Sequence, residues 1–154
     1  MRVLALDLGE RRIGVALSDS SGVLASPYGV IERSGDVAAD RARVASLVEE
    51  TEAGMLVVGL PLTLGGKQGA AARAAAAEAA ALASIVAVPV ETFDERLTTV
   101  EAERRRRSRL DGAERPGSPR RPRRSRRGPG REGIDAEAAA ILLEAWLDSR
   151  RSAP

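Results

Sequence analysis

Short apolar runs, separated by polar turns, open the chain and predict strands. Two of them are Val3–Leu6 and Ile13–Leu17, and the polar segment Asp19–Gly22 supplies a turn into a third, Val23–Ile31. The three runs predict three antiparallel strands joined by tight connections. Pro27 places the third strand at a sheet edge, because proline has no N–H to donate to a central ladder.

Helical and strand patterns alternate in the middle of the chain. A helix capped by Asp36 extends to about residue 52, where Gly54 is expected to stop it, and an alanine-rich helix covers Ala70–Ala83. Apolar strands follow these helices at Met55–Leu60 and Val86–Thr92. Because strands that alternate with helices pair in parallel through right-handed crossovers, the pattern predicts an α/β fold with a mixed sheet.

The last third of the chain changes character twice. Thr98 and Glu101 form a capping box for a short helix from about Thr99. Residues from about 110 to 133 are rich in arginine, proline, glycine and serine, which predicts a mobile basic loop. Order is expected to return at Ile134 as a final helix. Its apolar stripe consists of Ala138, Ile141, Leu142, Ala145 and Trp146.

Composition removes several classes of chemistry. The 154 residues correspond to a single domain, and the absence of histidine and cysteine excludes Ser-His-Asp catalysis, cysteine nucleophiles and zinc held by either residue. No apolar run approaches the roughly 20 residues of a membrane span, and an acid interrupts the N-terminal apolar stretch. We therefore expect a cytoplasmic protein with no membrane partner, whose chemistry uses carboxylates, arginines or an oxygen-bound metal.

The net charge of +2 hides an uneven distribution. Residues 104–131 contain 13 arginines and two acids, a local charge of +11, so the remaining residues sum to −9. Such a basic segment is typical of a surface that attracts phosphates. Only three aromatic residues occur in the whole chain, which argues against a platform for stacking bases.

Three acidic positions are candidates for chemistry. Asp7 ends the first strand, where a carboxylate needs a cation or donors, although a turn aspartate bonded to backbone amides is an equal alternative. Asp94 or Glu95 follows the last strand, at the edge where α/β sheets bind ligands, yet either could merely favour a helix N-terminus. Asp135 begins the final helix on its apolar side and could serve only as its N-cap.

Together these acids predict a site made of oxygen ligands. Carboxylates without histidine or cysteine suit Mg²⁺ or Mn²⁺. Two such ions about 4 Å apart can activate water and stabilise the leaving oxygen in phosphodiester hydrolysis. With a basic segment in the same chain, the residues favour a metal-dependent nuclease.

The same residues carry a family resemblance. Four blocks, in matching order and spacing, resemble the YqgF/RuvX family: Asp7–Asp19, Val57–Leu62 with Gly66, Asp94–Thr99, and Ile134–Ala139 continuing to Trp146–Asp148. The resemblance implies a ribonuclease H-like fold, with a five-stranded mixed sheet of order 3-2-1-4-5 flanked by helices. The segment Arg104–Arg131 is longer and richer in arginine than the family's basic loop.

The resemblance also implies an activity and a site. The family comprises metal-dependent nucleases, described either as Holliday junction resolvases or as the enzyme that matures the 5′ end of pre-16S rRNA. By motif position its catalytic and metal-binding acids fall on Asp7, Glu95 and Asp135, with Mg²⁺ or Mn²⁺ as the cofactor. Candidate nucleic-acid-binding residues are Arg11, Arg12, Lys67, Arg120, Arg121, Arg123, Arg124, Arg126 and Arg127.

Other functions remain open at this stage. Asp7-Leu8-Gly9 with Gly14 also resembles the first phosphate motif of actin-like ATPases, but those proteins need over twice this length. A non-catalytic nucleic-acid binder would not require three acids. Between the two nuclease substrates we favour pre-16S rRNA over a four-way DNA junction, because a junction resolvase needs an isologous dimer and the sequence offers no spare apolar patch for one. We therefore expect a monomer that acts on structured RNA.

Overall fold

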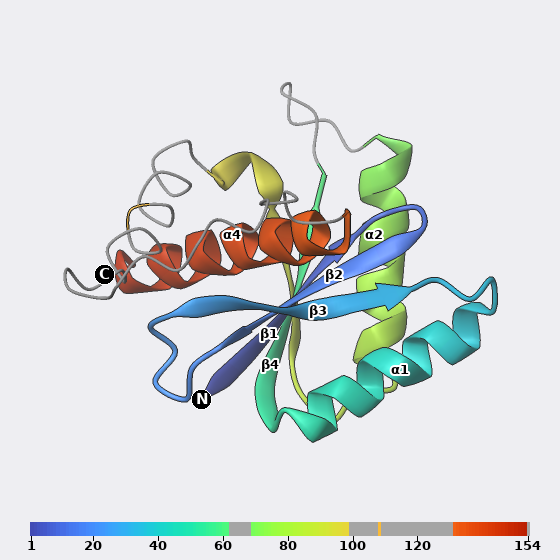
Figure 1. Ribbon diagram of the computed structural model, residues 1–154, viewed down its shortest axis with the longest axis horizontal. Helices are drawn as coiled ribbons and strands as arrows, with labels where there is room; N and C mark the ends of the chain where they lie inside the picture. Colours follow the sequence, from blue (N-terminus) through green and yellow to red (C-terminus); the bar gives the residue numbers. More distant parts are fainter. Residues whose placement is uncertain (62–68, 99–107, 109–130, 154) are drawn as a thin grey trace, which may run out of the picture.

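Five strands form one mixed sheet of order β3-β2-β1-β4-β5 (Figure 1). The computed structural model describes residues 1–61, 69–98, 108 and 131–153. The strands are β1 Arg2–Leu8, β2 Arg12–Ser18, β3 Ala25–Glu32, β4 Ala53–Leu60 and β5 Val90–Asp94. β2 is antiparallel to both β1 and β3, whereas β1, β4 and β5 are mutually parallel. The predicted strand order and the edge position of β3 are confirmed.

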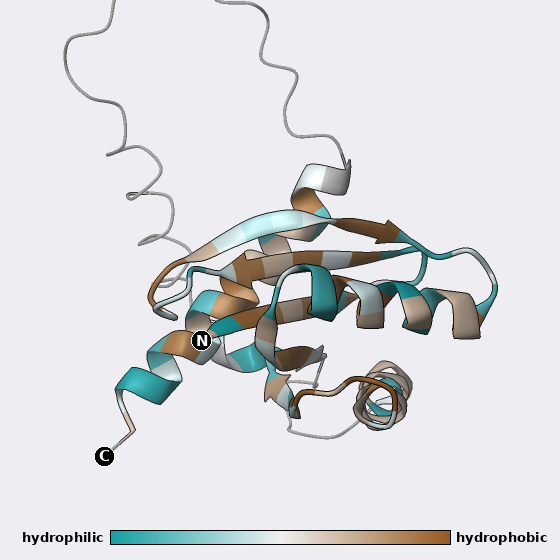
Figure 2. Cartoon of the chain, turned by 90° about the horizontal axis from the view of Figure 1, so that it is seen from below, coloured by the Kyte–Doolittle hydropathy of each residue, from teal (hydrophilic) through white to brown (hydrophobic). Residues whose placement is uncertain are grey.

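Helices cover both faces of this sheet. Their bounds are α1 Val37–Glu50, α2 Ala70–Ala83, the short 3₁₀ helix η1 Glu95–Leu97, and α4 Arg131–Arg151. One buried cluster joins the sheet to α1 and α2, and a second joins its other face to α4. Figure 2 shows apolar residues concentrated in the strands, whereas polar residues recur along α1. None of the helices in the described part of the chain is long and apolar enough to cross a bilayer.

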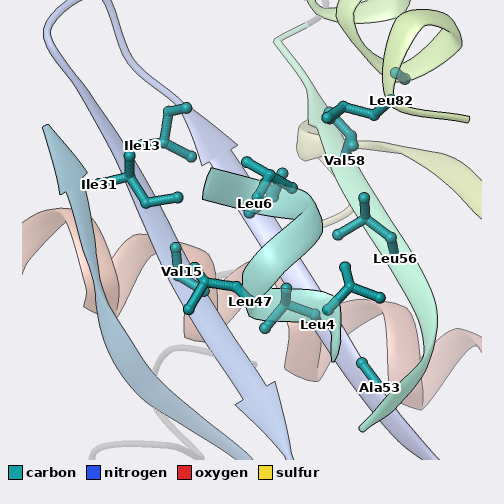
Figure 3. Packing of buried hydrophobic residues seen from close by; sticks show 13 residues of the cluster. Leu4, Leu6, Ile13, Val15, Ile31, Leu47, Ala53, Leu56, Val58 and Leu82 are labelled. Atoms are coloured by element: carbon teal, nitrogen blue, oxygen red, sulfur yellow. The ribbon is translucent and has the colours of Figure 1, made fainter. Parts of the chain in front are cut away.

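Alternation along β1 decides which side chains meet which helices. Leu4 and Leu6 are fully buried in the cluster beneath α1, where Leu47 packs against them (Figure 3). Val3 and Ala5 point to the opposite face and belong to the α4 cluster. Because successive side chains of a strand alternate between faces, Asp7 falls on the α4 side. The packing that stabilises β1 therefore also orients its only carboxylate.

Several predicted boundaries are wrong for local reasons. β5 begins at Val90 rather than Val86; Val86 and Val88 still pack against the core, but they precede the strand. Asp36 caps α1 as predicted, its carboxylate accepting from the N–H of Ala39 at 3.2 Å. Gly54 does not end α1, since it lies inside β4. The chain turns instead at Glu52, whose φ of 54° is a left-handed conformation.

The final helix starts earlier than predicted. α4 begins at Arg131, so residues 131–133 are helical and not part of a loop. Asp135 consequently lies inside the helix, and its interpretation as an N-cap is wrong. The capping box with Glu101 and the predicted basic loop up to residue 130 fall outside the described residues, apart from Thr98 and Ser108.

The edge of the sheet exposes apolar side chains that the sequence analysis assigned to packing. Val23 is 45% exposed, Leu24 50% and Tyr28 49%, all at or beside the start of edge strand β3. Packing on the sheet therefore does not account for these three side chains, and the monomer stays a prediction.

Candidate active site

Asp7 and Glu95 meet at the carboxyl end of the parallel strands. Asp7 is the sixth residue of β1, and Glu95 opens η1 directly after β5. The two carboxyl groups share a hydrogen bond, although 88 residues separate them along the chain. The sequence analysis left open that Asp7 is a turn aspartate that bonds only to nearby backbone amides. The hydrogen bond to the Glu95 carboxyl goes beyond that role.

A glycine makes room for Glu95. A Cβ on Gly59 of β4 would lie 2.7 Å from Glu95 Oε1 and 2.9 Å from a methyl carbon of Leu142. A side chain at this position would displace the Glu95 carboxyl or the Leu142 methyl group, so glycine leaves room for the carboxyl to lie across β4 toward Asp7. Asp94 takes a different role, since it accepts from the N–H and the guanidinium of Arg96 and caps η1.

The pair is arranged to share a proton. Burial, together with the negative charge of Asp7 and the hydrogen bond to it, raises the pKa of Glu95 to about 7. Burial also raises the pKa of Asp7, as does the charge of Asp135, while the bond from Glu95 opposes that rise. The two opposite effects of the shared bond indicate that Glu95 donates and Asp7 accepts. Two ionised carboxylates here would repel one another unless a cation lay between them.

Asp135 approaches from α4 because β2 carries a glycine beneath it. A Cβ on Gly14 would lie 2.0 Å from the backbone oxygen of Asp135, so the helix could not contact an alanine at this point. Gly14 is also the partner of Asp7 across the β1–β2 ladder, which brings the two acids to the same place. Arg12, two residues earlier on the same side of β2, extends Nη1 to within 3.7 Å of Asp135 Oδ2.

Arg12 bridges two acids at the start of β2. Its Nε lies 3.4 Å from Glu32 Oε1 on β3, while Nη1 faces Asp135. Arg11 is exposed in the preceding turn, and its carbonyl accepts from the N–H of Arg33 at 2.9 Å. Of these two predicted phosphate-binding residues, Arg12 thus lies beside an acid of the site, and Arg11 lies in the turn between β1 and β2. The other predicted basic contacts, at Lys67 and in residues 120–127, fall outside the described residues.

A small pocket opens at the acid pair. Its volume is about 150 Å³, and it is lined by Asp7, Glu95, Thr98 and three apolar α4 residues, Ala138, Ile141 and Leu142. A larger depression of about 590 Å³ lies at the other end of β2, around Asp19 and Tyr28. We place the site in the smaller pocket, because the acids with raised pKa values line it and the larger one is a broad surface hollow.

The donor set suits a hard divalent cation. Mg²⁺ is commonly held by one or two carboxylates and several waters, and the Asp7–Glu95 pair offers two carboxyl groups that otherwise need a proton between them. Within the described ranges, no three acidic side chains converge closely enough to form a preformed cage. The residues therefore fit an ion held mainly by the pair, with Asp135 close enough to influence Asp7 by its charge.

Sequence reasoning missed the residues that shape the site without carrying its chemistry. Gly14 and Gly59 each allow a close approach, and a glycine inside an apolar strand is the signal that could have identified them. Thr98 was expected to cap a following helix. It lines the pocket, and its hydroxyl donates to the carbonyl of Glu95 at 2.6 Å.

Comparison with known proteins identifies the family of this chain. The family model described as "RuvX: Holliday junction resolvase" matches residues 1–149. The chain belongs to the RuvX family. A relative from Anaeromyxobacter sp. (strain Fw109-5), named "Putative pre-16S rRNA nuclease", is 46% identical over 99% of this chain and 100% of its own length. A RuvX relative of the same name from Chloroflexus aurantiacus (strain ATCC 29366 / DSM 635 / J-10-fl) is 40% identical over 99% of this chain and 90% of its own.

Solved structures show the same fold for this RuvX chain. A structure described as T. thermophilus RuvC in complex with a Holliday junction substrate matches with a TM-score of 0.61, covering 98% of this chain and 96% of that one. The sequence identity is only 17%, so the likeness concerns the fold alone. It confirms the predicted ribonuclease H-like architecture.

Proposed function

We propose that this chain is a divalent-cation-dependent nuclease that processes the 5′ end of pre-16S rRNA in the cytoplasm. The observation that carries the proposal is the Asp7–Glu95 pair, two carboxyl groups from distant segments that share a hydrogen bond at the carboxyl end of the parallel strands. Ligand sites of α/β sheets lie at this edge. A buried acid pair that needs a proton or a cation is unsuited to a purely structural role.

Each residue of the site has a distinct part in the proposed reaction. Asp7 and Glu95 would hold Mg²⁺ or Mn²⁺ in place of their shared proton, with Asp135 as the third acid. A bound ion would lower the pKa of an attacking water and offset charge on the phosphodiester. Arg12 adds a guanidinium beside Asp135, where it can bind the phosphate next to the cut. Ala138, Ile141 and Leu142 of α4 form an apolar wall of the pocket beside the acids.

The choice of RNA rests on the relatives rather than on geometry. Those named above carry a pre-16S rRNA nuclease name over nearly the full length of this chain. A single acid site per chain suffices for one cut in a structured RNA, so we propose a monomer as the active form. Resolution of a four-way DNA junction is the second candidate, because the family description names that activity.

Cleavage of two substrates by the same preparation tests the proposal. The purified protein is incubated with Mg²⁺ or Mn²⁺ and either a precursor spanning the 5′ end of 16S rRNA or an immobile four-way DNA junction. We expect a single cut in the RNA that requires the ion and is abolished by Asp7→Asn. Glu10→Gln, in the exposed turn after Asp7, is the matched control and should cut like the wild type.

The alternatives give different results. A dimer by mass that cuts the junction at paired positions and leaves the RNA intact would overturn the rRNA assignment. Binding of nucleic acid without ion-dependent cleavage of either substrate would favour the non-catalytic alternative.

A further inference from the structure

Arginines of the described residues fall into two groups. Seven of those with described side chains form ion pairs with carboxylates: Arg2, Arg12, Arg41, Arg43, Arg96, Arg150 and Arg151. Three form none within the part of the chain that the structure covers: Arg11, Arg33 and Arg73. An unpaired guanidinium keeps its hydrogen-bond donors available for a ligand, whereas a paired one has already committed them. The position of the three unpaired arginines is therefore informative.

Arg11 and Arg33 lie together beside the active site. The N–H of Arg33 donates to the carbonyl of Arg11 at 2.9 Å, and its Nε donates to the carbonyl of Gly9 at 2.8 Å. These bonds tie the β3–α1 connection to the turn that follows Asp7. They occupy only Nε of the Arg33 guanidinium. Its charge also helps to lower the pKa of Asp40, but no hydrogen bond or ion pair within the described residues engages its two Nη groups.

Arg73 lies at the same edge of the sheet but beyond β4. It is exposed in the first turn of α2, which starts beside the end of β4 (Figure 1). Ile85 and Val86, just after the other end of α2, line a small depression together with Ala53 at the beginning of β4. Because α2 runs antiparallel to β4, its first turn lies at the end of the sheet where β1 and β5 bring Asp7 and Glu95 together.

We propose that Arg11, Arg33 and Arg73 bind successive phosphates of a single nucleic-acid strand that crosses this edge of the sheet over the acid pair. This inference rests on the proposed nuclease function and names the path of its substrate. From β3 to β5 the sheet spans about 19 Å, at ~4.8 Å per strand. A single strand of a few nucleotides covers that distance, because its neighbouring phosphates lie farther apart than the ~3.4 Å rise per base pair of a duplex. Guanidinium groups suit this partner because they bind phosphate oxygens in a bidentate manner.

The rim around the site also carries acidic residues, so it does not present a uniformly positive surface to a nucleic acid. Glu10 and Asp36 are exposed on the same rim. The Asp36 carboxylate is already engaged in capping α1, and the acid pair is the place for the cation. A polyanion would therefore be held at separate guanidinium contacts on either side of the site, and would not bind a featureless positive surface.

Binding without cleavage tests this path. A fluorescein-labelled RNA hairpin with a long single-stranded 5′ extension is titrated in EDTA at several NaCl concentrations, and affinity is read by fluorescence anisotropy. The test variant combines Arg33→Gln and Arg73→Gln, in which glutamine keeps an N–H donor. The control combines Arg43→Gln and Arg151→Gln, which removes the same charge from paired arginines elsewhere. Thermal unfolding of every variant verifies that it is folded.

We expect the double variant to lose two phosphate contacts. The slope of log affinity against log salt should fall by about 1.5, and affinity near 0.1 M salt should fall on the order of tenfold to fiftyfold. The control should match the wild type. Arg73→Gln alone, at an exposed helix position, should lower the slope by ~0.8 even if Arg33→Gln impairs folding.

The outcomes separate this inference from the proposed function. An unchanged slope in the double variant, or an equal loss in the control, would overturn the path even if the wild type cuts RNA in an ion-dependent way. If the double variant shows the expected fall in slope relative to the wild type, but the wild type cuts neither substrate, the path is supported and the nuclease function is refuted.

Discussion

Replacing Glu95 by glutamine should stabilise the metal-free protein at neutral and alkaline pH. The Glu95 carboxyl has a pKa raised from 4.5 to about 7 by burial and by Asp7. A raised pKa in the folded state means that folding favours the protonated acid. Its contribution to stability is therefore complete below pH 4.5 and is lost as pH rises through about 7. Glutamine resembles the protonated acid and cannot ionise, so the variant escapes this loss.

The expected size follows from the pKa and from exposure. Each pKa unit corresponds to ~1.4 kcal/mol, so a change from 4.5 to about 7 would give ~3 kcal/mol for a fully buried group. Glu95 is only half-buried, and solvent screening reduces the effect to ~1–2 kcal/mol. We expect Glu95→Gln and wild type to be equally stable near pH 4.5, and the variant to be more stable by that amount near pH 8.

Urea unfolding in EDTA, followed by circular dichroism across this pH range, measures the difference. Glu10→Gln controls for the loss of one carboxylate at an exposed position of the same rim, and its curve should follow that of the wild type. Saturating Mg²⁺ should then stabilise the wild type more than Glu95→Gln, because the variant has lost a ligand. A variant less stable than the wild type at every pH would show that the carboxyl is a structural hydrogen-bond partner, and would refute the reasoning.

Three further predictions address the surroundings of the pair. Gly14→Ala should destabilise the protein by ~3 kcal/mol in urea unfolding, because its Cβ would lie 2.0 Å from the Asp135 oxygen, whereas Gly29→Ala has nothing within 4 Å and should be close to neutral. Arg12→Gln should raise the affinity for Mn²⁺ roughly fivefold by calorimetry, since it removes a cation 3.7 Å from Asp135 Oδ2. An unchanged affinity would mean that the charge of Arg12 does not act on the bound ion. In the basic segment, alanine substitutions should flatten the salt dependence of RNA binding by 0.7–0.9 per lost contact, and an unchanged slope would make this segment a linker. The substituted residues are Arg120, Arg121, Arg123, Arg124, Arg126 and Arg127.

Apolar patterning predicted the elements of the fold well because the three central strands β1, β2 and β4 each bury a short continuous run. Boundaries were less predictable where they depend on tertiary contacts. Val86 and Val88 pack against the core without joining the β4–β5 ladder, so their apolar character alone placed the start of the last strand too early. The start of α4 was missed for a different reason. Residues 131–133 have a loop-like composition, and nothing local in Arg131-Glu132-Gly133 announces a helix.

The apolar pattern alone did not decide whether Asp94 or Glu95 belongs to the acid pair, because both lie at the end of the last strand. Phe93 belongs to the cluster beneath α4, so alternation along β5 turns Asp94, the last residue of the strand, to the other face. Glu95 opens η1 just beyond the strand and lines the pocket beside α4. The same alternation places Asp7 with Val3 and Ala5 on that side of β1. Strand parity therefore places Asp7 and excludes Asp94, whereas the 3₁₀ turn after β5 positions Glu95. The position of Asp94 directly after the buried Phe93 is therefore the sequence signal that separates it from Glu95.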